Sequence, residues 1–180
     1  MFKIIIISLL NGLMFAGYCY FVSHSILQKK STGIKSVLMA LIPFLLIYYC
    51  ILCLLESNYT IFFSGLCAFF FIKIIFRESI YISLFISIII HSFRIASKIL
   101  ILTVLNDNSM LLINTYKTLD WNVLYVDSAA LIIATIFILI LKKPLIGLIK
   151  YITGLKTKKI VNISNNICTF YFNISISTST

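Results

Sequence analysis

Four polar side chains recur along one apolar stretch of the chain: Ser87, His91, Arg94 and Lys98. Their spacings of four, three and four residues place them on one face of a helix. Charged groups inside a bilayer are costly, so side chains of this kind face protein or water and have partners. We therefore predict that this polar stripe faces the interior of a helical bundle.

Two acidic residues are predicted to lie at the same end of the bundle as Arg94 and Lys98. Glu56 directly follows one apolar run, and Asp127 lies one or two turns inside another. In one interpretation the four charges meet in a ligand pocket that is open to the outer face, with His91 as a further binding residue. In the other they are structural: Arg94 pairs with Asp127, and Lys98 extends to the headgroups.

His91 also raises the question of catalysis. A peptidase needs a nucleophile beside the imidazole, but no cysteine shares this run, and Cys168 lies in the C-terminal tail. Cys50 and Cys53 have the spacing of a metal or redox pair, but their neighbours are apolar and no second pair of ligands follows. We predict no catalytic residue, no metal site and no cofactor.

The composition of the whole chain is that of a membrane protein. Of its 180 residues, 61% are hydrophobic and 11% are charged, whereas soluble domains have about 25% charged residues. A soluble chain of this length could not bury so much apolar surface. The net charge of +10 indicates membrane topology, because the lysines flank apolar runs. We expect the lipid bilayer as a partner, and no nucleic acid.

Apolar runs of about 20 residues, long enough to cross a bilayer, occur along most of the chain. We predict an all-α bundle with transmembrane helices at Ile4–Val22, Val37–Leu55, Tyr59–Phe76, Ile80–Leu105 and Val123–Leu141. Leu145–Thr157 is either an amphipathic helix along the inner surface or an extension of the fifth helix. Residues 1–159 then form one domain, and Ile160–Thr180 is a polar tail or a weak sixth span.

Basic residues are concentrated in alternate connections between these runs. Three lysines lie between the first two runs, Lys73 and Arg77 lie at the third junction, and six lysines follow the fifth run. The other connections carry only Lys3 and Lys117. By the positive-inside rule, we predict a multi-pass protein of the cell membrane with its N-terminus outside and the region Lys142–Lys159 in the cytoplasm.

The junction between the third and fourth runs reads Phe76-Arg77-Glu78-Ser79-Ile80-Tyr81-Ile82-Ser83-Leu84. It resembles the F-(K/R)-E-S-(I/L)-x-x-S-(L/I) turn in the membrane sensor regions of Agr-type quorum-sensing histidine kinases of Firmicutes. The resemblance covers Met1–Lys159, and its specific part is Tyr59–Leu100. It implies a multi-helix sensor, a homodimer in the family's manner, that binds a cyclic peptide from outside. The family's phosphoacceptor helix and GHKL-type ATP-binding domain are missing from these residues, so the expectation is a sensor region without its kinase.

Two other classes of function stay open. A small transporter, or the substrate-binding subunit of one, would have this size and would call for six good spans. A non-catalytic membrane partner of another protein is also compatible with the sequence. The transporter hypothesis also requires a well-formed pocket at the midplane of the membrane.

Overall fold

The computed structural model describes residues 2–28, 34–54, 57–104 and 121–154, and all regular elements in these ranges are α-helices. The helices are α1 (Phe2–Leu27), α2 (Ile34–Leu54), α3 (Ser57–Phe76), α4 (Ile80–Val104), α6 (Trp121–Ile140) and α7 (Lys142–Gly154). The predicted all-α class is confirmed for this part of the chain. The tail Ile160–Thr180, and with it the question of a sixth span, lies outside the described residues.

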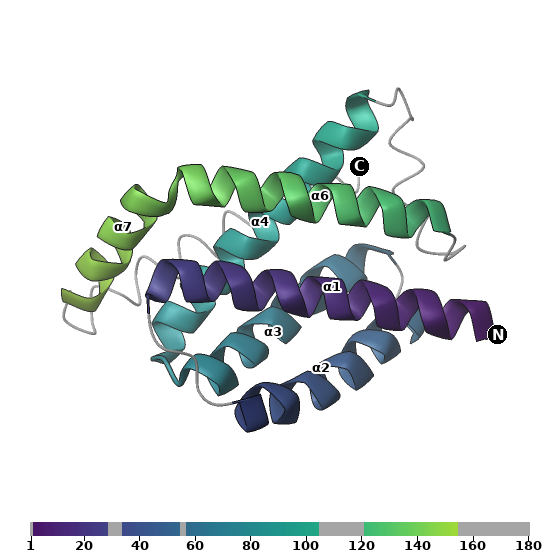
Figure 1. The fold of residues 1–180 in the computed structure, drawn as a ribbon, viewed down its shortest axis with the longest axis horizontal. Helices are drawn as coiled ribbons and strands as arrows, with labels where there is room; N and C mark the ends of the chain where they lie inside the picture. The colour runs from purple at the N-terminus through teal and green to yellow at the C-terminus, as the bar shows by residue number, and fades with distance from the viewer. Residues whose placement is uncertain (1, 29–33, 55–56, 105–120, 155–180) are drawn as a thin grey trace.

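The first five of these helices alternate in direction, and α4 is steeply inclined to α1 and α6 in the view of Figure 1. In the view of Figure 1, α1, α3 and α6 run from right to left, and α2 and α4 run from left to right. We call the end at which α1 and α6 begin the N-terminal end of the bundle, and the opposite end the α7 end. Helix α4 packs against both α3 and α6, while α1 packs against α2, α3 and α6. The stripe on α4 is therefore held in the middle of the bundle.

Two helices have the length and composition to cross a membrane, at Ile5–Leu27 and Ile80–Val104. A third qualifies if the bent pair Leu124–Ile140 and Lys142–Thr153 counts as one span. Within the described residues, the apolar segments of α2 and α3 are shorter, at Lys35–Ile51 and Phe63–Phe76. The structure thus supports two or three spans, and not the five that the sequence predicts.

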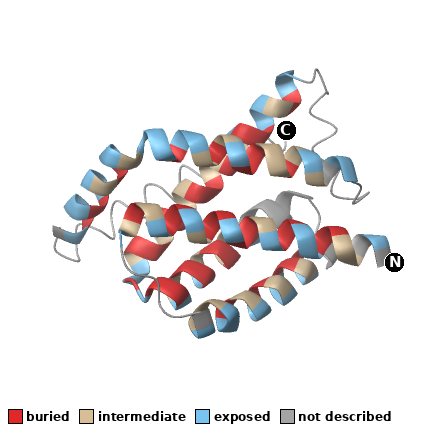
Figure 2. Ribbon diagram, viewed as in Figure 1, coloured by how far each residue is buried: buried red, intermediate tan, exposed pale blue. Residues whose placement is uncertain are grey.

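Exposed positions alternate with buried ones along the helices (Figure 2). Many of the exposed side chains are large and apolar. On α2, for example, Leu38, Ile42 and Leu46 lie on the exposed side, while Phe44 and Tyr48 are buried against the neighbouring helices. Large apolar patches of this kind are rare on soluble monomers, but acyl chains solvate them well. Pro43 lies inside α2 without ending it, as is common in membrane helices, where neighbouring groups satisfy the freed backbone. These features support a membrane location.

The α7 end is shaped by two helix endings and one proline. Gln28 and Arg77 follow α1 and α3 with φ angles of 53° and 51°, the left-handed conformation that commonly ends a helix. Pro144 has no backbone N–H to donate to the carbonyl of Ile140, and its ring clashes with that carbonyl. This explains why α6 ends at Ile140 and why α7 continues at 70° to it.

Replacing Gln28 by glycine is expected to stabilise the protein by about 1 kcal/mol, because glycine adopts a positive φ without strain. Gln28 is exposed, and its backbone N–H bonds to the carbonyl of His24 in either case. The free energy of unfolding, measured by denaturant titration in detergent micelles, should rise. Gln28→Ala is the matched control: it also shortens the side chain but keeps the strained Cβ, so it should bring no gain.

Candidate functional site: a buried charge network

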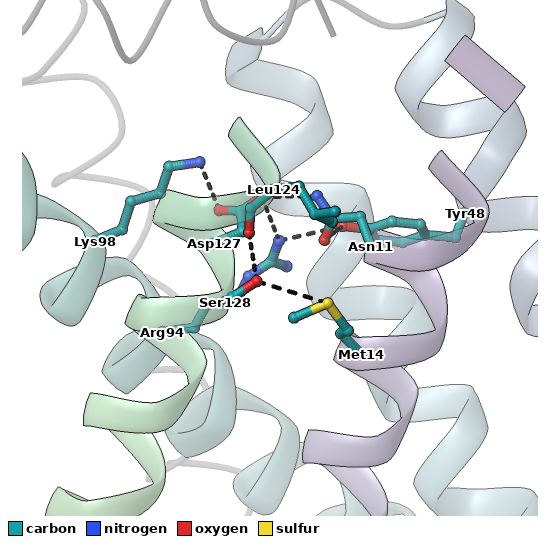
Figure 3. Close-up of polar contacts among 8 residues, drawn as sticks. All are labelled: Asn11, Met14, Tyr48, Arg94, Lys98, Leu124, Asp127 and Ser128. Atoms are coloured by element: carbon teal, nitrogen blue, oxygen red, sulfur yellow. Dashed lines mark hydrogen bonds and ion pairs between the residues drawn. The ribbon is translucent and has the colours of Figure 1, made fainter. Parts of the chain in front are cut away.

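Asp127 on α6 is the centre of a buried polar network (Figure 3). One carboxylate oxygen, Oδ1, accepts a hydrogen bond from Lys98 Nζ of α4 at 2.7 Å. The other, Oδ2, accepts one from Asn11 Nδ2 of α1, also at 2.7 Å. Asp127 is 0% exposed and Lys98 is 5% exposed. This carboxylate therefore joins three helices at one buried point.

Arg94 lies one turn before Lys98 on α4 and extends the network to α2. Its Nη2 atom is 3.7 Å from Asp127 Oδ2 and donates a hydrogen bond to the hydroxyl of Tyr48 at 3.1 Å. Tyr48 in turn donates to Asn11 Oδ1 at 3.4 Å. Four helices are connected in this way through side chains that are all buried. Because each polar contact is stronger where water is excluded, the network fixes the register of these helices.

Aromatic rings form the apolar wall of the network. The guanidinium carbon of Arg94 lies 4.2 Å from the centroid of the Phe15 ring, within cation–π distance. Phe15 contacts Phe44 and Tyr48, with ring centroids 6.0 and 5.7 Å apart. The positive charge of Arg94 thus lies between a carboxylate and an aromatic face. These two contacts compensate for the hydration that the buried guanidinium has lost.

The structure brings together three of the five predicted site residues, Arg94, Lys98 and Asp127. Glu56 lies outside the described residues. His91 is buried on α4, but its ring faces α3: a Cβ atom added to Gly65 would lie 3.6 Å from it. Near it, the Ser87 hydroxyl donates to the Gly65 carbonyl at 2.7 Å. The stripe therefore divides between two neighbours, with α3 on the Ser87 side and α6 on the Lys98 side.

The sequence does not predict three members of the network: Asn11, Phe15 and Tyr48. Asn11 carries the one usable signal, because it is an amide within an otherwise apolar run and amides in membrane helices commonly bond across to a neighbour. Phe15 and Tyr48 carry no such signal, since the chain has 15 phenylalanines and 10 tyrosines.

The arrangement is suited to holding helices together. Each charged group of the network is directed at another side chain. A group that competes for Lys98 or Asp127 would loosen α4 from α6. No family model, curated protein or solved structure matches this chain.

Proposed function

We propose that this chain is the membrane-embedded sensor region of a receptor for an extracellular signal, similar to Agr-type sensor regions. In this proposal α1, α2, α3, α4 and α6 all cross the membrane, with the N-terminal end of the bundle outside. The ligand is a small cyclic peptide. The receptor acts in a two-component quorum-sensing pathway as a homodimer.

The observation that carries the proposal is the path from the charge network to α7. Lys98 and Asp127 tie α4 to α6 in the half of the bundle nearer the N-terminal end. Helix α6 then leads directly into α7 at the other end. A movement of α6 against α4 at one end would therefore displace α7 at the other. A receptor needs this kind of connection between its two sides.

Because the network is buried, ligand binding requires the helices to move. Arg94, Lys98 and Asp127 are all at most 5% exposed, so a ligand cannot reach the three charges while the helices stay as they are. A cyclic peptide that enters between α2, α4 and α6 would favour a second arrangement in which these helices are further apart. Binding would shift the population between the two arrangements.

The proposed membrane topology predicts at which positions a fused reporter enzyme will be active. Alkaline phosphatase fused after Val104 should be active, because this position ends α4 on the outer side. Fusions after Phe76 or Gly154 should be inactive, because basic residues hold both positions in the cytoplasm. Enzyme activity normalised to fusion-protein level is the measurement. Activity at Gly154 with none at Val104 would reverse the proposed orientation.

Tryptophan fluorescence offers a direct test of the receptor. Trp121 is the chain's single tryptophan and begins α6, six residues before Asp127. In nanodiscs, synthetic thiolactone peptides with apolar side chains should change its emission in a saturable way. Lys98→Met should abolish the response, whereas Lys35→Met at the α7 end should leave it intact. A response that is identical in wild type and Lys98→Met would contradict binding through this network.

A small transporter, or the substrate-binding subunit of one, is the second candidate. It is favoured by the length of the buried polar stripe on α4, which includes Ser83, Ser87, His91, Arg94 and Lys98. A stripe of that length could line a path across the bundle once the helices separate. Saturable uptake of a small solute into proteoliposomes, without any peptide response from Trp121, would favour this function over the receptor.

A further inference from the structure

Helix α7 has three distinct faces. Leu145, Ile149 and Ile152 form a buried face, which packs against α1, α4 and α6. The spacing of four and three residues keeps these side chains in one line. This face is already occupied by the rest of the bundle, so it anchors α7 and leaves the other two faces free.

The second face is apolar and exposed. It consists of Pro144, Leu148 and Tyr151, again spaced by four and three residues, with Leu148 48% and Tyr151 63% exposed. A tyrosine beside a leucine on an exposed helix face is typical of the membrane interface, where the ring is apolar and the hydroxyl meets water.

The third face is positively charged. Lys143 and Lys150 are both exposed and lie seven residues apart, nearly two helical turns, so they share a side. No acidic residue occurs in α7. The acidic side chains whose positions the structure describes, Glu78 and Asp127, are both buried. The exposed charge at the α7 end is therefore positive wherever the structure describes it, and includes Lys35 and Arg77.

The direction of α7 fits these faces. It is bent by 70° from α6, and Figure 1 shows it turning away from the line of α6. If α6 crosses the bilayer, α7 lies close to the plane of the membrane surface. Its apolar face then meets the acyl-chain boundary, and its lysines meet the headgroups.

We propose that α7 is a binding site for anionic phospholipid, with Lys143 and Lys150 contacting the phosphate groups while Leu148 and Tyr151 enter the acyl-chain boundary. The lipid is thus a specific partner of this helix as well as the solvent of the bundle. The site lies at the end of α6 opposite the charge network. It does not depend on which signal the receptor binds, or on whether it binds one.

Quenching by brominated lipids tests this inference on the full chain. The variant Trp121→Phe/Tyr151→Trp places the single tryptophan on the exposed face of α7. It is reconstituted into nanodiscs of equal parts phosphatidylcholine and phosphatidylglycerol. Two samples are compared: in one the phosphatidylcholine carries bromine on its acyl chains, and in the other the phosphatidylglycerol does. Since a lysine near the surface enriches anionic lipid about fivefold, we expect severalfold stronger quenching when phosphatidylglycerol carries the bromines.

Charge variants identify the lysines responsible. Lys143→Gln/Lys150→Gln in the same background should bring the two quenching signals to equality, and Lys143→Arg/Lys150→Arg should keep the difference. Lys3→Gln, at the opposite end, should also keep it, and adding soluble glycerol phosphate should not compete. Equal quenching by both lipids in the parent variant overturns the proposal. So does a preference that persists in the glutamine variant.

Discussion

Replacing Asp127 by asparagine is expected to destabilise the protein by about 3–5 kcal/mol, the usual effect of removing one partner from a buried ion pair. The variant keeps the size of the side chain and removes the charge that Lys98 and Arg94 approach at 2.7 and 3.7 Å. Unfolding in denaturant, followed by helical circular dichroism in micelles, measures the loss. A variant as stable as the wild type would mean that the network contributes nothing to the fold.

Double-mutant cycles should show that the two cations depend on Asp127 to different degrees. Lys98 Nζ donates directly to the carboxylate, whereas Arg94 also contacts the Tyr48 hydroxyl and the Phe15 ring. We expect a coupling energy of about 2–3 kcal/mol between Lys98 and Asp127, near the top of the range for contacting residues, and about 1 kcal/mol between Arg94 and Asp127. The reverse order would contradict the geometry.

Replacing Phe15 by alanine is expected to destabilise the protein by about 3–5 kcal/mol, as is usual for a buried phenylalanine. Phe15 is 0% exposed and lies in the cluster of rings between α1 and α2. The loss has two physical parts: the cavity, and the aromatic face that Arg94 covers. The same unfolding titration measures their sum.

Phe15→Leu separates the two parts, because leucine fills most of the space and has no ring. If the cation–π contact matters, this variant should still lose about 2 kcal/mol, the value of such contacts away from water. Phe44→Leu is the matched control: Phe44 is also buried and also contacts Phe15. Equal losses in both variants would assign the whole effect of Phe15 to packing.

The sequence was enough to predict the stripe on α4, because a basic side chain within an apolar helix identifies the inward face. It was also enough to predict Asp127 as a partner, since the chain has only five acidic residues. Arg94, Lys98 and Asp127 do meet, but in a buried network; the open pocket is the other interpretation of the same residues, and Glu56 lies outside the described residues. Spacing alone could not show that His91 faces α3 while Lys98 faces α6, because a stripe of this width touches two neighbours.

The helix boundaries were predictable to within a few residues, except at the end of α1. That helix continues past the predicted boundary Val22 to Leu27, through the polar residues Ser23 and His24. Hydropathy ends a span at the first polar residues, whereas the backbone continues the helix until the left-handed turn at Gln28. The contacts of Phe15 and Tyr48 could not be predicted, since α1 and α2 are apolar on nearly all sides.

The link between Lys98 and Asp127 also has a consequence for how the protein is made. The two residues are 29 positions apart, so Arg94 and Lys98 are synthesised before the carboxylate with which they pair. A lone helix with Arg94 and Lys98 enters lipid at a considerable penalty. If both helices cross the bilayer, α4 is therefore expected to enter it more readily together with α6 than alone.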